Sequence, residues 1–235
     1  MGIHSFYCPE LQLDSQILEL PSSEAHHCAT VMRLKSGDEI RLMNGAGLTA
    51  SAQIINVEKR RVSCRIINVV SHMRTCEIRL YVAPPRNKNM ELLLKSATEL
   101  GVARITPILC EYGVVKPDGD KESWRQAVIA ACKQSGNPWL PIIDAPLSFN
   151  DALAQGNEIA FLGAVPKDAR PFDKDAVKSD KGYALWIGPE GGFSQTETQQ
   201  LLDYGAIPLT IGPYILRVET AVPALLGAIH FIISN

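Results

Sequence analysis

Short apolar runs and polar turns alternate over the first 70 residues, as in small all-β domains. A strand is expected over 39–43, and the following Asn44-Gly45-Ala46-Gly47 is a strong hairpin signal. Two β-branched runs, 50–57 and 62–70, flank the charged turn 58–61. The pattern predicts a small β-barrel or meander.

One helix interrupts these strands, from about residue 24 to residue 32. Ser22 or Ser23 precedes it and is expected to be its N-cap, because a hydroxyl oxygen there can accept a free backbone N–H. We assign residues 1–72 to this first domain.

Strands and helices alternate from Cys76 onward, which is typical of an α/β domain with a mainly parallel sheet. Gly101 and Gly136 follow two of the helices where left-handed C-terminal caps occur, and Ser194 with Glu197 forms a capping box. The expected strands are 77–82, 102–110, 158–162, 183–187 and 207–211, and the expected helices are 89–100, 121–134, 195–204 and 219–233. We assign residues 73–235 to this second domain.

The last expected helix, 219–233, is apolar nearly all round. It is too short to span a membrane, so we expect it to be buried between the sheet and another surface. A second subunit is the candidate for that surface, which predicts a homodimer.

The composition is that of an ordinary globular protein, with 46% hydrophobic and 20% charged residues in 235. No apolar run is long enough for a membrane span, and the N-terminus does not resemble a signal peptide. Six separated cysteines without a C-x-x-C pair predict reduced thiols packed as small apolar groups, and no metal site. A cytoplasmic location is expected.

A net charge of −2 does not mark the whole chain as a nucleic-acid binder. Any RNA contact must therefore come from a local basic patch. The candidates are Lys59, Arg60 and Arg61 with Arg65, and Arg33, Lys35 and Arg41 earlier in the same segment. A solvated hairpin turn is an equal alternative on pattern alone.

Two glycine-rich turns follow apolar strands near the C-terminus, Gly188-Pro189-Glu190-Gly191-Gly192 and Gly212-Pro213. Ligands of α/β sheets bind at the carboxyl ends of strands, and glycine lets the backbone approach a ligand closely. No Walker-type sequence is present, and Glu190 would repel a triphosphate. The turns predict a backbone-lined pocket for a flat ligand, with ligand-free turns as the alternative.

The full sequences of these turns carry a family resemblance. Residues 185–194 (Leu-Trp-Ile-Gly-Pro-Glu-Gly-Gly-Phe-Ser) and 211–221 (Ile-Gly-Pro-Tyr-Ile-Leu-Arg-Val-Glu-Thr-Ala) resemble the signature loops of the bacterial 16S rRNA (uracil-N3)-methyltransferases, which belong to the SPOUT superfamily. Residues 90–102 and 122–136 resemble two helices of that family, and 26–38 more weakly resemble its N-terminal domain.

The resemblance implies a SPOUT α/β trefoil-knot domain preceded by a PUA-like β-barrel that binds RNA. It also implies a homodimer, S-adenosyl-L-methionine as cofactor, and methylation at N3 of a uridine in 16S rRNA of the small ribosomal subunit. The residues that it implies for the cofactor pocket are Leu162, Gly163, Ile187, Gly188, Pro189, Glu190, Gly191, Ile211, Gly212, Leu216, Arg217, Glu219, Thr220 and Ala221.

Three of these residues are also catalytic candidates: Arg217, Glu219 and Glu190. Arg217 is the candidate cation for the target uracil, held by Glu219 or Glu190. A structural ion pair at the helix start is its equal alternative. Glu190 is either a base or, as we favour, a partner for backbone amides.

Two positions depart from the family pattern, which usually has arginine where this chain has Tyr214 and Asn137. Loss of two cations weakens phosphate contact, whereas Tyr214 can stack on a base. We expect RNA contact at Tyr214 and, after the first strand of the second domain, at Arg86 and Lys88. Three alternatives stay open: a SPOUT methyltransferase with another RNA target, an RNA-binding or ribosome-assembly protein that has lost turnover, and a structural dimer that binds no ligand.

Overall fold

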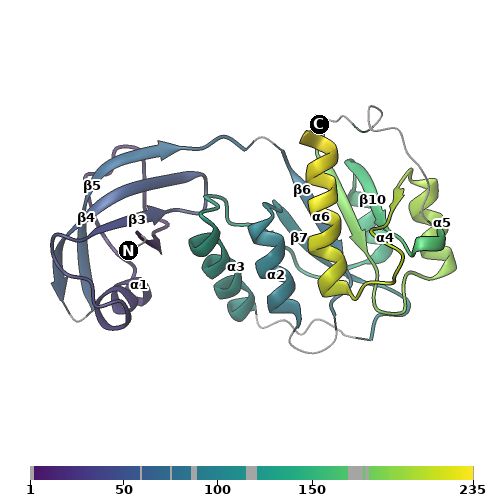
Figure 1. The fold of residues 1–235 in the computed structure, drawn as a ribbon, viewed down its shortest axis with the longest axis horizontal. Coiled ribbons are helices and arrows are strands. Elements are labelled where there is room, and N and C mark those ends of the chain that lie inside the picture. The colour runs from purple at the N-terminus through teal and green to yellow at the C-terminus, as the bar shows by residue number, and fades with distance from the viewer. Residues whose placement is uncertain are drawn as a thin grey trace. The chain divides into compact units, whose positions relative to one another are not determined.

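The computed structural model describes residues 3–58, 60–74, 76–85, 89–114, 121–168, 177 and 180–234. The chain divides into two compact units (Figure 1). The first consists of Met1–Thr75 and Ile129–Leu140, and the second of Cys76–Val128 and Pro141–Asn235. The chain therefore returns to the first unit after its first passage through the second.

The first unit contains a five-stranded sheet in the order β1-β3-β4-β5-β2. Its strands are β1 (His4–Tyr7), β2 (Ile17–Glu19), β3 (Glu39–Met43), β4 (Leu48–Glu58) and β5 (Arg61–Ser71). The predicted hairpin between β3 and β4 is confirmed: Asn44 Oδ1 accepts hydrogen bonds from the backbone N–H groups of Ala46 and Leu48 at 2.8 and 3.0 Å. Gly45 and Gly47 in this turn have φ of 74° and 92°. Glycine is favoured there because it has no Cβ to clash.

The predicted helix is confirmed as α1 (Ser22–His26), continued by the π-helical turn η1 (His27–Val31). The predicted serine cap is wrong. Pro21 occupies the N-cap position, no side chain bonds there, and the Pro21 carbonyl accepts the N–H of Ala25 at 2.8 Å. Both serines therefore lie inside the first turn.

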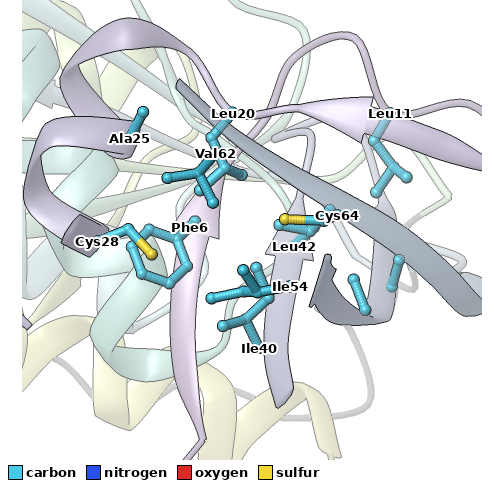
Figure 2. Packing of buried hydrophobic residues seen from close by; sticks show 12 residues of the cluster. Phe6, Leu11, Leu20, Ala25, Cys28, Ile40, Leu42, Ile54, Val62 and Cys64 are labelled. Carbon is cyan, nitrogen blue, oxygen red and sulfur yellow. The ribbon is translucent and has the colours of Figure 1, made fainter. Parts of the chain in front are cut away.

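The core of the first unit is a cluster of aliphatic, aromatic and cysteine side chains (Figure 2). Phe6, Cys28 and Cys64 are fully buried in it. Burial raises the pKa of the Cys28 thiol to about 11 and that of Cys64 to about 12. All six cysteines are free, and four of them are buried, as expected for packed thiols: Cys8, Cys28, Cys64 and Cys132. Their reduced state stays a prediction.

Helix α3 (Lys121–Ser135) begins in the second unit and ends in the first. Lys133 near its end lies 2.9 and 2.8 Å from the two carboxylate oxygens of the buried Glu24. Trp139 then forms a β-bridge with Ala46, and Arg74 lies 4.7 Å above its ring. These contacts, between residues far apart in sequence, attach 129–140 to the first unit.

The second unit is built on a seven-stranded sheet in the order β12-β10-β11-β6-β7-β8, with β9 also paired to β7. Every pairing is parallel, which confirms the predicted sheet. The strands are β6 (Ile78–Val82), β7 (Arg104–Leu109), β8 (Ile142–Ile143), β9 (Leu147–Ser148), β10 (Ile159–Gly163), β11 (Tyr183–Ile187) and β12 (Ile207–Leu209). Strands β8 and β9 were not predicted, because two residues carry no periodicity.

The sheet is covered by α2 (Asn89–Glu99), α4 (Phe149–Gln155), α5 (Gln195–Asp203) and α6 (Val218–Ser234), and the 3-10 turn η2 (Pro166–Asp168) follows β10 (Figure 1). Helices α4 and α5 pack with Tyr81 and Trp186, whose rings stack 4.0 Å apart. Helix α6 contacts α2 and β11. Within the described residues, no helix is long and apolar enough to cross a membrane.

Candidate functional site

The two glycine-rich turns lie at one edge of the sheet, because β11 and β12 are the parallel neighbours of β10. Together with the end of β10 they line a cavity of about 120 Å³, here called the first compartment. Eight of the predicted cofactor residues line it: Gly163, Ile187, Gly188, Pro189, Glu190, Ile211, Leu216 and Ala221.

A second compartment of about 710 Å³ adjoins the first. The two share six lining residues: Gly163, Ala164, Val165, Gly192, Phe193 and Ile215. The predicted Leu162 and Gly191 line this second space. The side chains of Lys167, Thr198 and Leu202 add polar and apolar groups to its wall. The two compartments form one cleft along the end of β10.

Two glycines of the cleft lie very close to neighbouring atoms. A Cβ on Gly163 would lie 2.5 Å from Cδ1 of Ile187, and a Cβ on Gly188 would lie 2.9 Å from the backbone nitrogen of Phe193. The second contact is with backbone, which no side-chain rotation can relieve. The shape of the first turn therefore depends on Gly188.

Helix α5 holds the first turn through the buried carboxylate of Glu197. Its Oε2 accepts the backbone N–H of Ser194 at 2.8 Å, and Ser194 Oγ accepts the N–H of Glu197 at 3.2 Å, which confirms the capping box. Its Oε1 also accepts the N–H of Glu111, just after β7, at 2.9 Å. This third bond, unforeseen from the sequence, ties the loop after β7 to the first turn.

The second turn ends where α6 begins. The carbonyl of Arg217 accepts the N–H groups of Thr220 and Ala221 at 3.0 and 2.7 Å, and Val218 is 3% exposed. Glu219 Oε1 accepts a hydrogen bond from Asn89 Nδ2 at 2.9 Å. The end of this turn is therefore held by α2 as well as by its own helix.

Four predicted cofactor residues do not line either compartment: Gly212, Arg217, Glu219 and Thr220. The expected ion pair of Arg217 with Glu219 or Glu190 is wrong, because Glu219 bonds Asn89 and no ion pair among the described residues involves Arg217. Its guanidinium is exposed beside the cleft's second turn. Glu190 is exposed and lines the first compartment.

Two family models match this chain. One, described as an RNA methyltransferase domain, covers residues 72–230, and the other, an RNA methyltransferase PUA domain, covers residues 20–67. Ribosomal RNA small subunit methyltransferase E of Aquifex aeolicus is 30% identical over 96% of this chain and 98% of its own length. The Bacillus subtilis protein of the same name is 30% identical over 92% of each chain.

This chain belongs to the ribosomal RNA small subunit methyltransferase E family. It is therefore an RNA methyltransferase, and its predicted family is confirmed. The family member from Neisseria gonorrhoeae, solved bound to S-adenosyl methionine, has a TM-score of 0.88 at 26% identity, over 99% of this chain and 98% of its own. A Legionella pneumophila protein solved with bound SAM has a TM-score of 0.87 at 30% identity, over 98% of each chain.

The two family models and the parallel sheet confirm an α/β methyltransferase domain preceded by a small PUA-like β domain. Membership of the SPOUT superfamily stays an expectation from the resemblance. The threading of the chain into a trefoil knot stays a prediction.

The predicted RNA-contact residues are distributed over both units. Arg33, Arg60 and Arg61 are exposed in the first unit, and Arg33 has φ of 55°, in the left-handed region. Tyr214 is 78% exposed in the second unit and lines the first compartment. Lys59, Arg86 and Lys88 lie outside the described residues.

Several residues of the cleft were not predicted from the sequence. Three of them lie within two positions of predicted residues: Ala164 and Val165 follow Gly163, and Phe193 follows Gly191 by two. Extending the predicted segments by two residues would have included them. Leu225 in α6 and Leu202 in α5 come from helix faces that only folding brings to the cleft. In the described part of the chain, no group of three potential ligands could hold a metal ion.

Proposed function

We propose that this chain transfers a methyl group from S-adenosyl-L-methionine to N3 of a uridine in 16S rRNA of the small ribosomal subunit. The observation that carries the proposal is the cleft shared by the two glycine-rich turns, in a chain of this family. The Neisseria and Legionella relatives, with the same fold, were solved with this cofactor.

The residues of the cleft fit the cofactor. The aliphatic side chains of Ile187, Ile211 and Leu216 suit the faces of a flat adenine ring, and the backbone at Gly188 is free of a Cβ. Of the described residues that line the first compartment, Glu190 is the one with a charged side chain. Its carboxylate favours binding of a cationic sulfonium over binding of a phosphate.

When bound, S-adenosyl-L-methionine supplies an electrophilic methyl group. The N3 nitrogen of neutral uracil carries a proton and has no free lone pair, so the chain must remove that proton. We assign the proton to the carboxylate of Glu190, the alternative to the backbone-amide role favoured from the sequence, because this side chain is exposed and lines the first compartment. Glu190 then releases the proton to water. We assign Arg217 to a uracil carbonyl oxygen, where its guanidinium stabilises the negative charge left on the base.

Glu219 receives a different role from the one expected. Its carboxylate accepts the Asn89 amide and does not line the cleft, so we assign it to positioning the start of α6. Arg217, two residues earlier, is placed by that start. Gly212 and Thr220 remain candidates for cofactor contact through their backbone.

The first unit is proposed to hold the rRNA. Exposed Arg33, Arg60 and Arg61 offer cations that phosphates attract regardless of sequence. Lys59, Arg86 and Lys88 stay candidates for the same contact. The chain is proposed to work in the cytoplasm, where small ribosomal subunits are found.

A homodimer is also part of the proposal. Helix α6 carries Phe231, which is 62% exposed, whereas the large aliphatic side chains Val222, Leu225, Leu226 and Ile229 of the same helix are buried. A second copy packed on this helix would cover Phe231, and an isologous dimer is the commonest such arrangement.

The proposal is tested with small ribosomal subunits from cells that lack the gene, tritiated S-adenosyl-L-methionine and mapping of the modified nucleoside. We expect 3-methyluridine at one position, and its loss in Arg217→Ala. Methylation of a different nucleoside would show that the enzyme has another target in the RNA. Cofactor binding without methylation would favour a non-catalytic RNA-binding protein. If calorimetry detects no binding at millimolar cofactor, the proposed methyltransferase activity is rejected.

A further inference from the structure

Two aromatic residues line the first compartment, Phe193 and Tyr214. Phe193 is half-buried and packs edge-on against Phe149, with ring centroids 5.8 Å apart. Tyr214 is 78% exposed, and within the described residues its side chain makes no ring contact or hydrogen bond. Tyr214 therefore presents a free aromatic face at the cleft.

The neighbours of Tyr214 are apolar as well. Ile215 is 76% exposed and lines both compartments, and Ile211 is 38% exposed. Burial of apolar side chains lowers the free energy, so a ligand bound at this edge is expected to cover them. Among the described residues that line the first compartment, no cation is present to attract a phosphate.

A uridine methylated at N3 must reach this cleft without a pairing partner. N3 lies on the Watson–Crick edge of uracil and carries a hydrogen bond in every paired base. We expect the unpaired base to leave its stack on entering the cleft, which costs a few kcal/mol. Enzymes recover part of that cost by stacking the extruded base on an aromatic side chain.

We infer that Tyr214 is a substrate-binding residue that stacks on the extruded target uracil at the cleft. This inference rests on the proposed function. The ring supplies a planar apolar surface to the base, whereas an arginine at the same position supplies a charge to the backbone. The chain thus recognises its target at this point by the base face and not by the phosphate.

Steady-state methylation of small ribosomal subunits tests the inference with four variants. Tyr214→Ala is expected to raise the KM for subunits about 10-fold, within the range that loss of one stacked base gives. Tyr214→Phe keeps the ring and is expected to stay within about 2-fold of wild type. Leu92→Ala is the control for loss of an exposed apolar side chain, because Leu92 is 55% exposed and lines neither compartment.

The salt dependence, measured with Tyr214→Arg as the fourth variant, separates stacking from charge. Tyr214→Ala is expected to leave the slope of log KM against log salt unchanged, whereas Tyr214→Arg is expected to steepen it by about 1. A flattened slope in Tyr214→Ala would overturn the inference. So would a KM equal to wild type, or an equal loss in Tyr214→Phe, which would assign the effect to the hydroxyl.

Two further readouts exclude other occupants. Calorimetry is expected to give Tyr214→Ala the same cofactor Kd within about 3-fold, since the stacked base contributes nothing to cofactor binding alone. A larger change would make Tyr214 a cofactor contact, and a change in molar mass by light scattering would make it a subunit contact; either overturns the inference. Failure of the wild-type protein to methylate subunits would instead reject the proposed function.

Discussion

Asn89 Nδ2 donates a hydrogen bond to Glu219 Oε1 across 130 positions of the chain, at 2.9 Å. The ring of His230 contacts the carbonyl of Leu100 at 2.7 Å, also across 130 positions. Because both pairs have the same separation, α2 and α6 run parallel with their turns in register. The first pair lies at the start of α6, directly after Arg217 and the second glycine-rich turn.

Removal of the first pair should destabilise the second unit. Asn89→Ala is expected to lower the free energy of unfolding by about 1.5–3 kcal/mol, because it leaves a half-buried carboxylate without its donor. Urea denaturation measures the loss. Lys95→Ala on the exposed side of α2 is the control and should stay within about 0.5 kcal/mol. Equal stability of the two variants would contradict a stabilising role for the bond.

Gly188→Ala should weaken cofactor binding. Its Cβ would lie 2.9 Å from the nitrogen of Phe193, so the turn must shift, and we expect the calorimetric Kd to rise at least about 10-fold. Gly227→Ala in α6 is the matched control, since its Cβ meets nothing within 4 Å. An unchanged Kd in Gly188→Ala would show that the cofactor does not depend on this turn.

Glu197→Gln should loosen the first turn without touching the cleft. One carboxylate oxygen is replaced by an amide NH₂, which must face a backbone N–H of Ser194 or Glu111. We expect a loss of about 1–3 kcal/mol in the free energy of unfolding, together with a weaker cofactor Kd. Gln199→Ala on the exposed side of α5 serves as control. A variant as stable as that control would rule out a strong contribution from Glu197.

Arg217→Ala should separate chemistry from stability. Its side chain is exposed and has no ion pair among the described residues, so the free energy of unfolding should change by less than about 0.5 kcal/mol. The kcat should fall about 100-fold or more if the guanidinium stabilises the uracil anion. Arg217→Lys, which keeps the charge, should recover part of the rate. A large loss in the free energy of unfolding with an unchanged kcat would show that Arg217 has a structural role and not a catalytic one.

The buried thiols should make the fold sensitive to alkali. Burial raises the pKa of Cys132 from 9.0 to about 12. A raised folded-state pKa contributes stability that is present below pH 9 and is lost as the pH rises toward 12. The free energy of unfolding of the wild-type protein, measured by urea denaturation, is therefore expected to fall between about pH 8 and about pH 10. In Cys132→Ala this fall is expected to be smaller by about 1 kcal/mol. An identical fall in that variant would mean that this thiol is not protected.

Local patterns were sufficient for much of this fold. The Asn44–Gly47 turn, the Ser194 capping box and the parallel sheet follow from rules that act over a few residues, since turn chemistry and periodicity need no partner from elsewhere in the chain. Pro21 shows the limit of such rules. Two serines suggested a cap, but the proline before them already had the extended conformation that starts the helix.

The sequence by itself determined the family, the longer strands and helices of the second domain, and the two turns of the cleft, because periodicity, glycines and strand ends mark them locally. Only the tertiary structure decided that Glu219 faces Asn89, that Glu197 binds Glu111, and that Tyr214 is left uncovered at the cleft. Each depends on which residues from distant segments fill the neighbouring space. Spacing along the chain does not contain that information.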